Sequence, residues 1–256
     1  MKCLEKNGKK IFLIAAILLG VAVLAQVVPV LLRLWDVLEG LFNGYRFATI
    51  LDGLVTVANL GLQGLVPIAF IVFAFVYMRT GSHYYLLAVA SGVALAQMLL
   101  TTTLSLVSYF IGGVGSKYFM DNLLSNLLYG YLPSDLIPYL LFALIVVFSV
   151  KKKGCQVIPG AVLALLGGLL LNGVYGQCKS FLYYIYQIFE YGIEFEWVIK
   201  NLLSIFCEFI YLITWYGGLI LLVPAALQCK VSAQAETEEL PAQVCVTEED
   251  FVPEAE

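Results

Sequence analysis

Long apolar runs, separated by short polar segments, make up most of this chain of 256 residues. Six runs suit helices that cross about 30 Å of bilayer hydrocarbon, and they are residues 11–32, 54–78, 84–110, 136–150, 157–175 and 202–227. The fourth run, with 15 residues, is the shortest. The runs are continuous and do not alternate between apolar and polar positions, which favours helices over the strands of a barrel. The pattern therefore predicts an all-α integral membrane protein with six transmembrane helices.

An approximate threefold repeat underlies the six runs. Each copy holds an alanine and a glycine four residues apart, followed by an amide side chain, and the three sets are Ala16, Gly20 and Gln26; Ala88, Gly92 and Gln97; and Ala164, Gly168 and Asn172. Each repeat contains two spans, so all three enter the membrane in the same direction, as repeats related by an axis along the membrane normal do. We therefore expect three parallel helical hairpins, 11–80, 81–153 and 154–230, arranged as a pseudo-threefold bundle.

Small residues and prolines inside the runs indicate how the helices pack and bend. In the fifth run a ladder of residues at steps of four lies on nearly one helix face, and its members are Gly160, Ala164, Gly168, Asn172 and Gly176. Such a ladder lets another helix pack closely, and we expect the same packing role for Gly20 and Gly92. Pro67 and Pro138 each free a backbone carbonyl within a span, and we expect them to act as hinges.

The segments between spans on the outer side are predicted to lie in the membrane interface. In 33–53, apolar residues at helical spacing accompany Trp35, Asp36 and Glu39, which is typical of an amphipathic helix lying among the headgroups. In 181–197 eight aromatic residues indicate an interfacial belt.

Charge sets the expected orientation. The chain is 61% hydrophobic and 12% charged, which places it in a bilayer. With the N-terminus inside, the inner segments carry nine basic residues and the outer segments five, so the positive-inside rule predicts two cytoplasmic termini. Residues 1–10 then form a basic cytoplasmic lead, and 231–256, with eight acidic and no basic residues, form a disordered cytoplasmic tail. We expect the plasma membrane as the location.

The sequence lacks the residue patterns of the common catalytic and metal-binding sites. His83 is the only histidine and falls in a cytoplasmic turn, which argues against a Ser–His dyad or a histidine-ligated metal. The six cysteines have no metal spacing, and we interpret them as inert thiols, with Cys178 and Cys207 the only pair that an oxidising compartment could join. We expect no enzyme activity, no cofactor, no metal and no nucleic-acid partner.

Polar side chains within the spans are the candidate substrate-binding residues. Gln26, Gln97 and Asn172 occupy related positions, so they could line a central axis as a polar site at mid-membrane, or join helices to one another. Glu208 is an ionisable residue within a span and is a candidate for that reason. It could bind a cation or carry a proton, or instead pair with Lys179 or Lys200 or hydrogen-bond a tyrosine.

Two functions of different classes fit these features. The sequence slightly favours a small-solute permease or permease subunit with a polar site at mid-membrane. The alternative is a non-catalytic assembly or regulatory subunit that uses the small-residue ladder, with or without the acidic tail, to bind a partner membrane protein. The expected partners are the lipid bilayer and either such a protein or further copies of the chain. The scarcity of charges within the spans weakens the first function, and the three related amides weaken the second.

Overall fold

The computed structural model describes residues 6–45, 47–113, 132–151, 157–191 and 195–239. In these ranges the regular structure is helical, and the helices are α1 (Lys6–Phe42), α2 (Phe47–Thr80), α3 (Tyr85–Gly113), α5 (Leu132–Val150), α6 (Val157–Tyr191) and α7 (Phe195–Glu239). All except α5 are long and apolar enough to cross a membrane, and α5 contributes the shorter apolar segment Leu136–Val150. The prediction of an all-helical, multi-pass membrane protein is therefore confirmed.

Four helices, α1, α2, α6 and α7, are much longer than the spans expected for them. With 35 residues, α6 is about 52 Å long, whereas the hydrocarbon is about 30 Å thick. The predicted separate amphipathic helix in 33–53 is absent because α1 continues to Phe42 and α2 begins at Phe47. No glycine or proline stands between Pro29 and Gly40, and α1 ends only before Gly44, whose positive φ of 69° is typical of a helix C-cap. The aromatic segment is likewise helical, since α6 runs to Tyr191.

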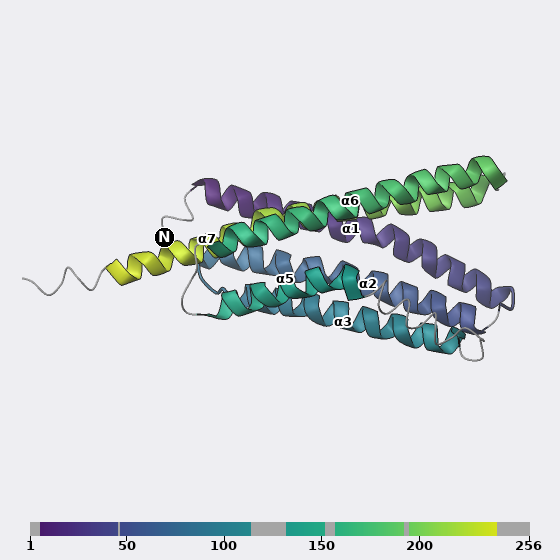
Figure 1. Ribbon diagram of the computed structural model, residues 1–256, viewed down its shortest axis with the longest axis horizontal. Helices are drawn as coiled ribbons and strands as arrows, with labels where there is room; N and C mark the ends of the chain where they lie inside the picture. The colour runs from purple at the N-terminus through teal and green to yellow at the C-terminus, as the bar shows by residue number, and fades with distance from the viewer. Residues whose placement is uncertain (1–5, 46, 114–131, 152–156, 192–194, 240–256) are drawn as a thin grey trace, which may run out of the picture.

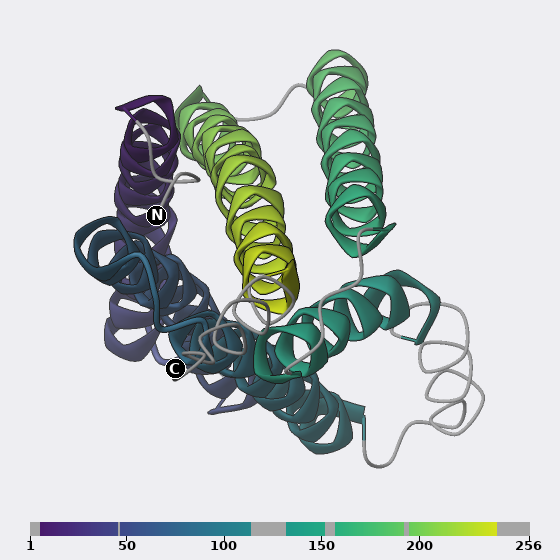
Figure 2. The same ribbon diagram turned by 90° about the vertical axis from the view of Figure 1, so that its left-hand side faces the viewer.

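Helices adjacent in the chain pack against one another, and α7 returns to pack along α1 (Figure 1). Contact between α5 and α6 is slight compared with the other pairs. Figure 2 shows the consequence: α6 stands at the edge of the bundle, next to α7 and apart from α1, α2 and α3. The threefold arrangement stays a prediction. The first residues of the expected tail, 231–239, belong to α7, and the rest of that tail lies outside the described residues.

The apolar core lies toward the lysine-rich end of the bundle, which we call the inner end. Aromatic rings from three helices meet there: the Phe70 ring on α2 lies 6.3 Å from that of Phe142 on α5 and 5.6 Å from that of Trp215 on α7. Beside them α1 and α7 approach closely at Gly218, where an added Cβ would lie 2.8 Å from Cγ of Leu19. Because lipid is as apolar as these side chains, close packing rather than escape from water holds the helices together.

Lys230 closes the inner end. Its side chain is on α7, the residue is only 7% exposed, and Nζ donates hydrogen bonds to the carbonyl oxygens of Phe148, Ser149 and Lys151 at 2.7, 2.8 and 2.6 Å. Carbonyls at the end of a helix have no partner within the helix and form the negative end of its dipole, so a cation suits this place. Nζ also lies 5.7 Å from the ring of Tyr84, in the turn between α2 and α3. We call this arrangement the Lys230 clamp.

Replacing Lys230 by methionine should destabilise the bundle, because three carbonyl oxygens at the end of α5 would lose a charged donor. We expect the free energy of unfolding to fall by about 3 kcal/mol, measured as a lower melting temperature of the purified protein in mild detergent. Lys9→Met, which removes an exposed lysine at the same end, is the matched control. Equal melting temperatures for the two variants would contradict a structural role for the Lys230 clamp.

Candidate functional site

Side chains at seven-residue steps form rows along the core-facing side of four helices. A step of seven is close to two helical turns, so each row follows one face. From the inner to the outer end the rows are Phe12, Leu19, Gln26 and Arg33 on α1; Tyr77, Phe70, Gln63 and Thr56 on α2; Leu87, Ala94 and Thr101 on α3; and Leu222, Trp215, Glu208 and Asn201 on α7. Every row begins with apolar or aromatic residues and becomes polar halfway along.

Burial changes at the same depth. The apolar and aromatic members of the four rows are between 0 and 7% exposed. Of the polar members, Gln26 is buried, Arg33 is exposed and the others are half-buried. The polar members, together with Asn59, Gln97, Gln177 and Ser204, form what we call the outer polar layer. The inner half of the bundle is thus mainly apolar, with Ser91, Ser149, Thr214 and Lys230 as its buried polar residues, and the rows carry polar groups toward the outer end.

Two acceptors in the outer polar layer have no hydrogen-bond partner among the described residues. Gln26, on α1, is 3% exposed, and its Nε2 donates to Oε1 of Gln63, on α2, at 3.5 Å. Its own Oε1 is buried and unpaired, as is Oδ1 of Asn59, one turn from Gln63 on α2. A buried acceptor without a donor costs free energy, so this place favours a water or a solute that can donate hydrogen bonds.

The three repeat-related amides make separate contacts. Gln26 is bonded to Gln63, and Nε2 of Gln97 donates to Oγ1 of Thr101 on its own helix at 2.9 Å. Asn172 is exposed on α6, and its side chain makes no hydrogen bond to the described residues. No hydrogen bond therefore joins any two of the three in the described part of the chain, and the amide ring stays a prediction.

Glu208 joins α6 to α7. Its carboxylate accepts hydrogen bonds from Nε2 of Gln177 on α6 at 3.3 Å and from Oγ of Ser204 at 3.2 Å. Neither of the expected lysines pairs with it among the described residues, because Nζ of Lys200 lies 3.6 Å from the carboxylate of Asp36. The partners of Glu208 are thus an amide and a hydroxyl, and sequence reasoning missed Gln177 because it lies just beyond the expected fifth span.

Pro67 stands at the boundary between the two halves. On α2 it lies between Gln63 of the polar half and Phe70 of the apolar half, within a continuous helix. Pro138 occupies the corresponding place on α5, just outside the buried residues Leu141 and Phe142. Both positions suit a hinge, and the hinge role stays a prediction.

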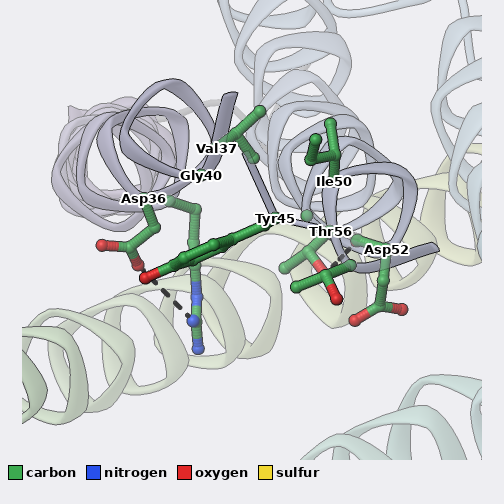
Figure 3. Close-up of a pocket in the computed structure, with 10 residues that line it drawn as sticks. Asp36, Val37, Gly40, Tyr45, Ile50, Asp52 and Thr56 are labelled. Atoms are coloured by element: carbon green, nitrogen blue, oxygen red, sulfur yellow. Dashed lines mark hydrogen bonds and ion pairs between the residues drawn. The ribbon is translucent and has the colours of Figure 1, made fainter. Parts of the chain in front are cut away.

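A cavity of about 200 Å³ lies between the outer ends of α1 and α2 (Figure 3). Figure 3 shows the Tyr45 ring lying across it, with Asp36 on one side and Asp52 and Thr56 on the other. Asp36 is paired with Arg33 at 3.7 Å, and Oγ1 of Thr56 donates to the carbonyl oxygen of Asp52 at 2.9 Å. Because Thr56 also belongs to the α2 row, the cavity adjoins the outer polar layer. Sequence reasoning missed it because it assigned all of these residues except Thr56 to an interfacial segment, 33–53.

The small-residue ladder on α6 is uncovered. All five of its members are exposed, and a Cβ added to its glycines would meet nothing within 4 Å. The same open space surrounds Gly20 and Gly92. Within the described part of the chain, close helix contact occurs at Gly218 and at Gly173, which packs against Leu212 of α7. The described part of the chain therefore packs no helix against the ladder, including Gly160, Ala164 and Gly168, and the packing role of the ladder stays a prediction.

The cysteines differ in state. Cys178 is exposed and Cys207 is buried, and both are free thiols, as the interpretation of the cysteines as thiols expects. Cys229, at the inner end, is disulfide-bonded, and the interpretation of this residue as an inert thiol is wrong. Among the described residues no group of three or more histidine, cysteine or acidic side chains is placed to hold a metal ion.

Comparisons of the chain with protein-family models, with curated proteins and with solved structures found no match. The functional proposal therefore rests on the geometry of the outer polar layer and on the packing of the helices.

Proposed function

We propose that this protein is a small-solute permease or a permease subunit whose substrate site is the outer polar layer. One observation carries the proposal: the core-facing rows of α1, α2, α3 and α7 all change from apolar to polar about halfway along. Polar groups within a membrane are costly and face a bundle interior or a water-filled space when they are retained. Helix association alone does not require them on four helices at once, because small residues and close packing serve that purpose.

The lining favours a solute that donates hydrogen bonds, such as an amine or a polyol. Its unpaired groups are the acceptors Oε1 of Gln26 and Oδ1 of Asn59. The carboxylate of Glu208 is paired with two neutral donors among the described residues, so it keeps its negative charge uncompensated there and can accept further hydrogen bonds. The cavity at Tyr45 adjoins this lining from the outer side. We therefore assign the half-buried outer end to substrate entry.

In this proposal the inner end is the closed gate. The rings of Phe70, Phe142 and Trp215 fill it, and the Lys230 clamp fixes α7 to the end of α5. Substrate release to the other side requires these contacts to part while the outer polar layer closes. Pro67 and Pro138 stand where the two halves meet, so bending there would move one half against the other.

Glu208→Gln should abolish uptake, because it removes the only carboxylate in the α7 row while keeping the hydrogen-bonding shape. The assay is uptake of labelled amines, amino acids and polyols into proteoliposomes that contain the purified chain. Glu39→Gln, a change at an exposed acid of α1, is the control and should keep at least about half of the uptake. Uptake that survives Glu208→Gln unchanged would show that the outer polar layer does not hold the solute.

The proposal places both termini in the cytoplasm, on the basis of the basic residues at the inner end. A reporter fused to the C-terminus should then be protected from protease in intact cells, and one inserted after Asn43, in the turn between α1 and α2, should be cleaved. The opposite result would instead agree with the disulfide at Cys229, since disulfides persist in oxidising compartments.

The uncovered ladder on α6 favours a second candidate, a membrane assembly or regulatory subunit. Only 11% of the apolar stretch of α6 is buried, against 44% for α7. A different membrane protein that copurifies in stoichiometric amount, together with absence of uptake, would favour this candidate over transport.

A further inference from the structure

A continuous apolar row covers the free side of α6. Its members alternate at steps of four and three residues, beginning with Val157, Ala161, Ala164, Gly168, Leu171 and Tyr175. Cys178 and Leu182 continue the same spacing. All eight are exposed, and the large side chains Val157, Leu171, Tyr175 and Leu182 are 65 to 74% exposed. We call this row the α6 seam.

The α6 seam is opposite the side by which α6 joins its own chain. Val162, Leu166 and Gly173 form the attached side: the first two belong to the apolar core, and Gly173 packs against Leu212 of α7. At 3.6 residues per turn, these positions lie about half a turn from Ala164 and Leu171 of the seam. Figure 2 agrees, since α6 stands at the edge of the bundle with one side toward α7. The described part of the chain therefore leaves the seam uncovered.

Spacing of four and three residues is the pattern of paired helices. Its mean period of 3.5 residues keeps one seam facing a partner helix through a left-handed supercoil. The small residues Ala161, Ala164 and Gly168 let two backbones approach closely. The α6 seam carries no charged residue, so nothing in it repels an identical seam.

The hydrocarbon of the bilayer does not extend along the whole seam. Starting at Val157, a helix crosses about 30 Å of hydrocarbon in roughly 20 residues. Cys178 and Leu182 lie beyond that length, as does Phe189, which continues the spacing and is 85% exposed. A row of large apolar side chains that leaves the hydrocarbon is typical of a surface covered by protein.

We infer that the α6 seam is covered by the same seam of a second copy, in a parallel homodimer. Copies in one membrane share their orientation, so a two-fold axis along the membrane normal sets each seam residue beside its counterpart. Small residues then meet small residues near the inner end, and Cys178 meets Cys178 beyond the hydrocarbon. Asn172 flanks the seam and has no hydrogen bond to the part of the chain that the structure describes. Its amide both donates and accepts, so it can bond to the second copy.

Cysteine cross-linking of the full chain in membrane vesicles tests this inference. After mild oxidation, the unaltered chain should give a band on a non-reducing gel at twice the 28.2 kDa chain mass. Cys178→Ser should reduce that band at least fivefold. Adding Leu182→Cys to the Cys178→Ser chain should restore it. Ser180→Cys, added to the same Cys178→Ser chain, is the matched control. Ser180 is exposed and lies near Leu182 along the helix axis, but on the opposite side of α6.

Two tagged copies of the Cys178→Ser chain, expressed together, supply a measure that needs no cysteine. Each copy should copurify with the other in mild detergent, and Gly168→Leu, which adds bulk within the seam, should lower that copurification several-fold. Equal cross-linking from Ser180→Cys and Leu182→Cys would indicate random collision and would overturn the inference. Cross-linking of Leu182→Cys to a protein of another mass would also overturn it. None of these results depends on uptake, so the homodimer and the permease proposal can fail separately.

Discussion

The closed inner end is the constraint on which the rest of the structure depends. Lys230 brings an ammonium group to three carbonyl oxygens at the end of α5 and thereby joins segments about 80 residues apart in the chain. Without it, α5 would be held mainly by α3, because its contact with α6 is slight. Farther along the same helices, the rings of Phe70, Phe142 and Trp215 pack against one another and join α5 and α7 to α2. In lipid such fitted contacts, rather than apolar burial as such, decide which helices stay together.

From this closed end the bundle changes character over a short distance. On α2, Phe70 is fully buried. Gln63, seven residues farther out, accepts a hydrogen bond from Gln26, and Oε1 of Gln26 has no partner among the described residues. The same change on α1, α3 and α7 makes it a property of the bundle rather than of one helix. A packed inner end with a polar, half-buried outer end is the arrangement that a solute pathway needs in a state open to the outer side. The α6 seam has a separate role, since it faces away from these rows.

Much of the fold could be predicted from the sequence, because apolar runs and base-rich turns are local features. The separate helix in 33–53 was predicted wrongly, since helical spacing alone does not reveal whether a helix is continuous with the span before it. The rows could not be recognised in advance because a seven-residue step has meaning only when the buried face is known. The partner of Glu208 could not be predicted either, since Gln177 reaches it from another helix. The ladder on α6 was visible in the sequence, but whether the chain itself covers it depends on how α5 and α6 meet.

Water accessibility along the α2 row tests the central claim most directly. Cysteines placed one at a time at Thr56, Gln63, Phe70 and Tyr77, in a chain whose reactive native cysteines are replaced, would be exposed to a membrane-impermeant thiol reagent from the outer side. The account predicts labelling at Thr56 and Gln63, at least about tenfold slower labelling at Phe70 and none at Tyr77. Equal protection at all four positions would mean that the outer polar layer is only a set of contacts between helices, and the permease proposal would lose its basis.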